Sequence, residues 1–273
     1  GSTSSSVTAY GTVTGSPNAV YVLNYGTGAT SITATGATLT GGTNGIRVLA
    51  QSNTTDLTVT ADNVTGTSGA GIFANSQSYA GTTITTTNAT GTGQVTGGQH
   101  GIDATHTGNF NLRLNVDNVT GGTGHGILAN GIGNSENLYI DVTGTVQGDL
   151  DGINALGSLQ PFSPSYDAVL SSNASNADGT VQVTGGQSGI EVYNTDAGSL
   201  SVTADNVTGT ARNGIYALNS FTSKDLSIRT YGTVTGGLVG IDARNNLNYS
   251  STVNTSNADG TGQVTGGVFG ISL

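Results

Sequence analysis

The amino-acid sequence predicts an all-β fold, a parallel β-helix of about ten rungs. A phrase of the form Val-Thr-Gly, often followed by a second glycine and then by Gly-Ile-x-Ala, returns about ten times in 273 residues. Successive copies lie roughly 24 to 37 residues apart, a period typical of solenoids and propellers, in which each unit packs against its neighbours. We therefore expect one continuous repeat domain over residues 1–273. Because the chain begins with Gly1-Ser2 and contains no methionine, we expect it to be a fragment of a longer protein.

The residue types of the repeat decide among the repeat architectures. Each glycine destabilises a helix by about 1 kcal/mol, and the chain contains 45 glycines, so a helical solenoid is excluded. Propeller blades use longer units of four antiparallel strands with periodic aromatic residues, whereas only 5% of this chain is aromatic. A parallel β-helix is the architecture that fits.

Each unit contains runs that alternate as β-strands do. In residues 101–104, Ile102 and Ala104 would point to one side and Asp103 to the other. A second alternating run precedes the Val-Thr-Gly phrase, as in residues 57–61 and 200–204. Two or three short strands per unit, separated by glycine turns, would form one rung.

Stacked rungs would place one isoleucine per unit in a common interior ladder, and each burial would contribute about 1.5–3 kcal/mol. We expect an aspartate in place of Ile127 to disrupt the stack. We also expect the paired glycines after Val-Thr to take a positive φ at a corner, where a Cβ would be penalised. The predicted ladder consists of Ile46, Ile72, Ile102, Ile127, Ile153, Ile190, Ile215, Ile241 and Ile271.

Charge and cysteine usage restrict the partners. The formal net charge is −10, and only six residues are Lys or Arg, so the chain lacks the basic surface that nucleic acid requires. Binding to anionic lipid is disfavoured for the same reason, and no apolar run is long enough to enter a membrane. The absence of cysteine excludes disulfides and thiolate metal sites and is compatible with secretion.

The rungs fall into three classes. Asp62-Asn63, Asp117-Asn118 and Asp205-Asn206 mark one class, while Gly-Thr and Gly-Gln or Val-Gln precede the valine in the other two. Three rungs make a super-repeat of about 81 to 88 residues. This pattern indicates duplication, which lengthens a rod and does not build a single active centre.

The phrase at residues 232–237, completed by residues 240–243, resembles the passenger domains of bacterial autotransporters (type V secretion), particularly those of adhesin and autoaggregation proteins. The resemblance covers nearly the whole chain. It implies a single-stranded right-handed parallel β-helix, exported through a C-terminal outer-membrane barrel and displayed on the bacterial cell surface or secreted.

A search for enzymatic signatures yields two fragments similar to the polygalacturonase signature, at residues 124–126 and 194–196. They stand in the opposite order from that family and lack its adjacent Asp pair and its Arg-x-Lys segment. We interpret the match as accidental. We therefore predict that the chain is not an enzyme and has no catalytic residue and no cofactor.

Two groups of residues could hold a metal. Asp149 and Asp151 could pair or form a calcium loop with Asn154, but calcium requires six or more oxygen ligands. We interpret these aspartates as a solvated turn. The three histidines, His100, His106 and His125, are not at zinc spacing, and we interpret them as turn residues. No metal site is predicted.

Two surfaces could bind a partner. The outward position of Gly-Ile-x-Ala would form a ladder that mixes Tyr21, Arg47, Phe73, Asp103, Leu128, Asn154, Glu191, Tyr216 and Asp242. From it we select Phe73, Leu128, Tyr216, Asp103 and Asp242 as candidate binding residues; the alternative is that a nearby loop covers the apolar members.

The second surface is a predicted protruding loop over residues 157–179, in which prolines accompany Phe162 and Tyr166. These two aromatic residues could recognise a ligand or could shield the wall of the coil.

The function that we expect is that of a cell-surface adhesin segment, which mediates self-association with neighbouring cells through the lateral wall of the β-helix. The alternatives are binding of a host glycan or matrix protein through the 157–179 loop, and a passive structural stalk.

Overall fold

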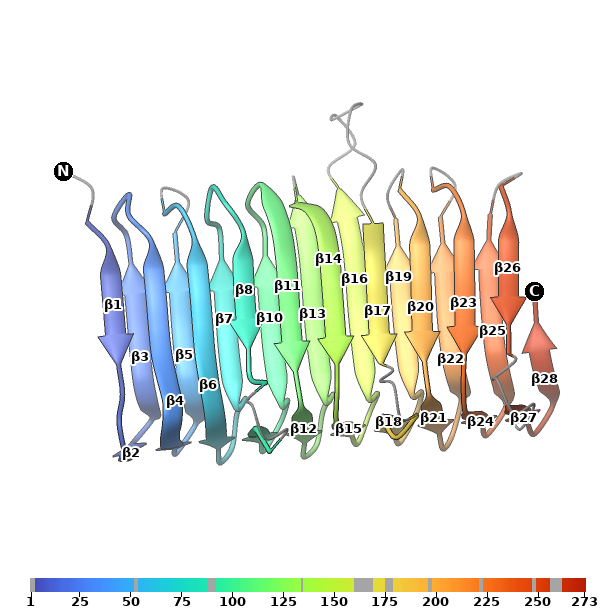
Figure 1. Cartoon of the computed structure of the whole chain (residues 1–273), viewed down its shortest axis with the longest axis horizontal. Coiled ribbons are helices and arrows are strands. Elements are labelled where there is room, and N and C mark those ends of the chain that lie inside the picture. The colour runs from blue at the N-terminus through green and yellow to red at the C-terminus, as the bar shows by residue number, and fades with distance from the viewer. Residues whose placement is uncertain are drawn as a thin grey trace.

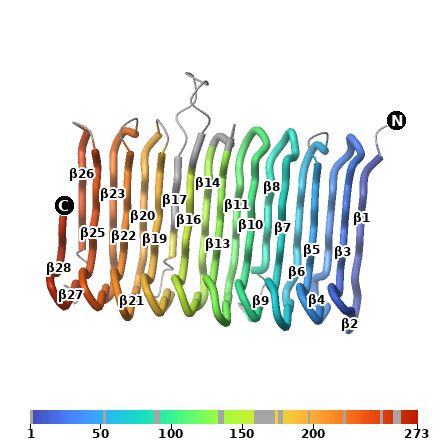
Figure 2. Tube along the Cα trace, turned by 180° about the vertical axis from the view of Figure 1, so that it is seen from behind, coloured from blue at the N-terminus to red at the C-terminus, as the bar shows by residue number. Residues whose placement is uncertain are grey.

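The computed structural model describes residues 3–51, 54–87, 92–133, 135–159, 169–174, 179–195, 198–220, 223–246, 249–255 and 262–273. These residues form an all-β coil of about nine turns, in which every strand pairing is parallel. The coil is elongated, and its two termini lie at opposite ends (Figure 1). Figure 2 shows the same regular succession of turns from behind. The predicted parallel β-helix is confirmed.

Each turn has three sides, which we number in chain order. The first and second sides belong to one sheet of 18 strands, and the third side is a sheet of ten strands. On the first side lie β1 (Ser5–Thr8), the start of β4 (Thr30–Gly41), the start of β6 (Leu57–Gly66), β8 (Thr82–Thr85), β11 (Phe110–Val116), β14 (Ser135–Val142), β17 (Val169–Ala174), β20 (Leu200–Ala204), β23 (Leu226–Thr230) and β26 (Ser251–Asn254).

The second side is built from short strands that end in the glycine corner. It consists of β2 (Thr12–Gly15), the ends of β4 and β6, β9 (Gln94–Gly97), β12 (Asn118–Gly121), β15 (Thr145–Gly148), β18 (Gln182–Gly185), β21 (Asn206–Gly209), β24 (Thr233–Gly236) and β27 (Gln263–Gly266).

The third side carries the Gly-Ile-x-Ala phrase. It consists of β3 (Asn18–Asn24), β5 (Asn44–Ala50), β7 (Ile72–Ser76), β10 (Ile102–His106), β13 (Ile127–Gly133), β16 (Ile153–Leu159), β19 (Ile190–Asn194), β22 (Asn213–Asn219), β25 (Val239–Asn245) and β28 (Phe269–Ser272). No helix that is long and apolar enough to cross a membrane occurs in the part of the chain that the structure describes.

The interior is the stack of apolar columns that the alternation predicts. The isoleucines from Ile46 to Ile271 pair strand by strand on the third side. Every member from Ile46 to Ile241 is fully buried, whereas Ile271 on the last strand is 44% exposed. A column of valines, with Leu39 in one turn, faces the isoleucines from the second side. The predicted ladder is therefore confirmed.

The prediction that the paired glycines take a positive φ is wrong. Among the described glycines, only Gly11, Gly36 and Gly179 have a positive φ. The requirement at the corner is steric, because the chain turns back on itself there. A Cβ on Gly41 would lie 1.7 Å from the carbonyl oxygen of Asn44, and a Cβ on Gly97 would lie 1.7 Å from that of His100.

The three rung classes have a structural basis at the corner between the first and second sides. Asn206 joins three turns there: its Nδ2 donates to the carbonyl of Gly179, 3.0 Å away, and its Oδ1 accepts from the amide of Thr233, 3.1 Å away. Asn118 makes the equivalent bonds to Gly93 and Thr145. These two Asp-Asn rungs are therefore each hydrogen-bonded to a rung of a different class on either side.

Candidate functional site

The outward side chains of the third side form the predicted mixed ladder. Phe73, Asp103 and Leu128 occupy three consecutive strands in register, and Tyr216 and Asp242 occupy two others. Phe73, Asp103, Leu128 and Tyr216 are half-buried, and Asp242 is buried. The structure thus places the five candidates on one face but brings them together in two separate groups.

The apolar members at the N-terminal end of this ladder hold a cation between them. The guanidinium carbon of Arg47 lies 5.9 Å from the ring centroid of Tyr21 and 5.3 Å from that of Phe73. Because consecutive rungs carry these three residues, the two rings flank the guanidinium, an arrangement that cation–π attraction stabilises. Phe73 therefore packs within the wall.

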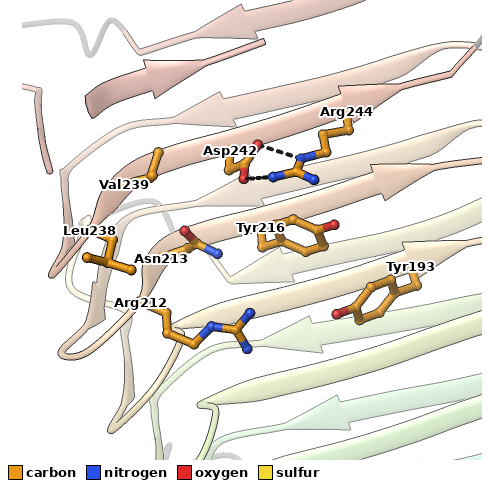
Figure 3. Close-up of a pocket in the computed structure, with 8 residues that line it drawn as sticks. All are labelled: Tyr193, Arg212, Asn213, Tyr216, Leu238, Val239, Asp242 and Arg244. Atoms are coloured by element: carbon orange, nitrogen blue, oxygen red, sulfur yellow. Dashed lines mark hydrogen bonds and ion pairs between the residues drawn. The ribbon is translucent and has the colours of Figure 1, made fainter. Parts of the chain in front are cut away.

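A pocket opens in this face at the other end of the coil, across β19, β22 and β25 (Figure 3). Its volume is about 320 Å³. Two of the predicted candidates, Tyr216 and Asp242, line it. The full lining is Tyr193, Arg212, Asn213, Tyr216, Leu238, Val239, Asp242 and Arg244.

The pocket joins aromatic rings to paired charges. Tyr193 and Tyr216 have ring centroids 5.5 Å apart with planes inclined at 56°. The guanidinium of Arg244 donates from Nε and Nη2 to the two oxygens of Asp242, at 3.0 and 2.7 Å, and its central carbon lies 5.3 Å from the Tyr216 centroid. A bidentate pair of this kind fixes the orientation of the guanidinium plane.

A buried carboxylate lies beside the pocket. Glu191 is 7% exposed, and it accepts hydrogen bonds from the hydroxyls of Ser188 and Tyr193. Burial, followed by the bond to Glu191, raises the pKa of Tyr193, so this residue remains a neutral phenol. Burial likewise raises the pKa of Tyr216. Arg212 lies 4.0 Å from Glu191 and is 53% exposed, so its charge is only weakly neutralised.

The alternation of the strands could have identified two of the residues that the sequence prediction missed. Tyr193 and Arg244 follow Glu191 and Asp242 by two positions, so they occupy the next outward column of the same strands. Arg212 and Leu238 stand at corners of the coil. No periodic signal in the sequence places corner side chains over a neighbouring strand.

The predicted loop contains regular structure. β16 continues to Leu159, and β17 lies within the range 157–179 and pairs with β14 and β20. Residues 157–159 and 169–174 are therefore paired within the coil, and for these described residues the expectation of a protruding loop is wrong. Residues 160–168, which include Phe162 and Tyr166, and residues 175–178 lie outside the described residues, so the candidate role of the two aromatic residues stays a prediction.

His100, His125 and Asp151, which stand at corners of three consecutive turns, interact with one another. The imidazoles of His100 and His125 stack, and His125 Nδ1 lies 3.1 Å from Asp151 Oδ2. Asp151 also accepts hydrogen bonds from Asn154 Nδ2 and from the amide of Ser188, each at 3.0 Å. It is 5% exposed, so the interpretation of Asp151 as part of a solvated turn is wrong, whereas Asp149 is exposed.

The hydrogen bonds of Asp151 explain its ionisation. Burial opposes the charged form, but the bonds from His125, Asn154 and Ser188 outweigh it and hold the pKa of this carboxyl below its ordinary value. Its partners are structural groups of neighbouring turns. Within the described ranges, no group of three or more His, Asp or Glu side chains is arranged to hold a metal ion.

The second side presents a different surface, which we call the threonine face. Its outward side chains form two columns, one on each side of the buried valines. Every member is a threonine, an asparagine or a glutamine. One column is Thr12, Thr38, Asn63, Gln94, Asn118, Thr145, Gln182, Asn206, Thr233 and Gln263, and the other is Thr14, Thr40, Thr65, Thr96, Thr120, Gln147, Thr184, Thr208, Thr235 and Thr265.

No protein-family model, curated protein or solved structure matches the chain. The resemblance to autotransporter passenger domains therefore stays a prediction that the repeat phrase supports.

Proposed function

We propose that this chain is a segment of a bacterial cell-surface adhesin that associates sideways with other copies of itself through the threonine face. The observation that supports the proposal is the composition of that face, which carries no charged side chain at its outward positions from the first turn to the last. The other two sides carry charges at outward positions, as Arg113 and Asp141 do on the first and Arg47 and Asp103 on the third.

Electrostatics favour this face over the other two. Two copies with a formal charge of −10 each repel one another, and at physiological ionic strength that repulsion is screened beyond about 8 Å. Repulsion at contact therefore depends on the charges at the interface itself. An uncharged surface is where two such copies approach with the smallest penalty.

The regular spacing of the turns supplies the affinity. Rungs of a β-helix repeat at about 4.8 Å, so the hydroxyl and amide groups of two antiparallel or parallel copies can match along the whole face once one rung is matched. Each side-chain hydrogen bond between exposed groups is weak. Many such bonds acting together give a stable contact through multivalency. The proposed role needs no catalytic residue and no cofactor.

The proposal is tested on the parent protein displayed on a host that does not clump. The disrupting variant carries Thr65→Glu, Thr120→Glu and Thr208→Glu, which stand on three separate turns of the threonine face. The matched control carries three glutamates at outward positions of the first side, at Thr58, Thr85 and Ser201. Circular dichroism establishes that both variants keep their β structure.

We expect cells with the wild-type protein and with the control to settle, and cells with the disrupting variant to settle no faster than the empty vector. Equal settling of the two variants would contradict the assignment of the face. Absence of settling with the wild-type protein would favour a passive stalk or the binding of a host glycan or matrix protein.

A further inference from the structure

The pocket on the third side has features that the proposed self-association does not use. It lies on a different side of the coil from the threonine face. Two of the six basic residues of this acidic chain, Arg212 and Arg244, line it. Both side chains are more than half exposed, at 53% and 56%, so they are accessible to a ligand.

The two arginines differ in what they can offer. Arg244 uses Nε and Nη2 for Asp242, which orients the group and leaves Nη1 to donate to a neutral acceptor such as a hydroxyl. Arg212 has its nearest carboxylate, on Glu191, at 4.0 Å, beyond hydrogen-bonding distance. Its fork of donors suits a carboxylate, which a guanidinium binds in a bidentate manner.

The rest of the lining suits a ring that has both apolar and polar edges. Tyr216 lies between the guanidinium of Arg244 and the ring of Tyr193, and in Figure 3 the hydroxyl of Tyr193 points toward the Arg212 side of the pocket. Leu238, which is 49% exposed, closes the corner with an apolar surface. Small-molecule sites combine such aromatic and apolar walls with a few oriented polar groups.

We propose that this pocket binds a saccharide residue that carries a carboxylate. Arg212 pairs with the carboxylate, Arg244 and the Tyr193 hydroxyl bond to ring hydroxyls, and the C–H face of the sugar packs on Tyr216 and Leu238. A neutral sugar offers Arg212 no carboxylate with which to pair. An inorganic anion gains nothing from the tyrosines. The pocket is therefore expected to prefer a ligand that has both a carboxylate and a sugar ring.

The test is calorimetric titration of the chain with trigalacturonic acid, with maltotriose as the neutral probe and sodium sulfate as the inorganic anion. We expect trigalacturonic acid to bind and the other two to bind at least about tenfold more weakly, as the loss of one charge-assisted hydrogen bond predicts. Equal binding of maltotriose or of sulfate overturns the proposal, and so does the absence of binding by trigalacturonic acid at millimolar concentration.

Variants locate the site. Arg212→Gln removes the cation at an exposed position and is expected to weaken trigalacturonic acid binding by about tenfold, with an unchanged melting temperature. Arg229→Gln is the control, because it removes the same charge from an exposed position on the first side of the coil, where Arg229 lies over the ring of Tyr231. Wild-type affinity in Arg212→Gln overturns the proposal. Settling of displayed cells is expected to be unaffected by Arg212→Gln, so the failure of one proposal is distinguishable from the failure of the other.

Discussion

The ring of His125 stacks on the ring of His100, with centroids 5.4 Å apart and planes 8° from parallel. The amide of His125 also donates to Nδ1 of His100, 3.1 Å away, so the two rings are fixed by the stacking of consecutive turns. Burial, and then the adjacent His125, lower the pKa of His100. His106, in the same part of the coil, is fully buried, and its burial lowers its pKa too.

The lowered pKa values of His100 and His106 predict that the fold loses stability on mild acidification. The unfolded chain, in which histidine has a pKa near 6.5, takes up protons that the folded chain resists. The free energy of unfolding therefore falls as the pH drops from about 7 through 6.5 toward the lowered folded values. Melting temperatures at about pH 7.5 and pH 5 measure the loss. In the variant His106→Gln the side chain cannot titrate, so its melting temperature is expected to fall less between these two pH values than that of the wild type. An equal fall in the wild type and the variant would show that His106 does not cause the loss of stability.

The corner glycines provide a test of the steric explanation. We expect Gly41→Ala to destabilise the coil by about 1–3 kcal/mol or more, because its Cβ would meet the carbonyl oxygen of Asn44. Gly42→Ala is the control, since its Cβ would lie 3.3 Å from the Ser16 hydroxyl oxygen, which can rotate away. That control is expected to stay within about 1 kcal/mol of the wild type. Urea denaturation compares them, and similar midpoints for the two variants would refute a steric role.

The interior isoleucine column predicts a strong contrast between adjacent residues. Ile127 is fully buried, so Ile127→Ala is expected to lower the free energy of unfolding by about 2–5 kcal/mol. Its neighbour Leu128 faces outward and is half-buried, and Leu128→Ala is expected to lower it by about 1 kcal/mol or less. Thermal unfolding followed by circular dichroism measures both effects. A larger effect of Leu128→Ala would mean that the outward ladder, and not the interior column, holds the turns together.

An internal amide ladder at the end of the third side is a further determinant of stability. Asn219 is fully buried. Its Nδ2 donates to the carbonyl of Lys224 at 3.0 Å, and its Oδ1 accepts from Asn194 Nδ2 at 2.9 Å. Asn219→Ala removes both bonds, although each partner keeps another, from Asn245 to the carbonyl of Lys224 and from Asn194 to the carbonyl of Gly198. At about 0.5–1.5 kcal/mol for each lost bond, the variant is expected to reduce stability by about 1–3 kcal/mol. Asn130→Ala, on the outward face of the same sheet, is the control. Equal urea midpoints for the two variants would show that the ladder is dispensable.

The repeat phrase was sufficient to predict the coil and the membership of the isoleucine column, whereas it left open whether each turn holds two or three short strands. A repeated unit packs against its own copies, so the contacts of Ile102 with Ile72 and Ile127 follow from the recurrence alone. The alternation also predicted that Tyr216 and Asp242 face outward on adjacent strands, as they do. Both residues occupy the third position of the Gly-Ile-x-Ala phrase, and that shared position predicts their common orientation.

Only the tertiary structure decided what the corners and the outward columns do. The first glycine of each pair is required because a carbonyl three or four residues away approaches it closely, and not because of its φ. The burial of Asp151 depends on donors from the turns before and after it. The pocket forms where the corner residues Arg212 and Leu238 extend over strands that carry Tyr193 and Asp242.

The sequence by itself therefore determined that the chain winds into a β-helix and which side chains fill its interior, because identical units in contact can satisfy one another in only one register. The tertiary structure decided which surface residues meet. Side chains on the outside differ from turn to turn, and the approach of Arg212 to the carboxylate of Glu191 depends on corner geometry that no repeat pattern encodes.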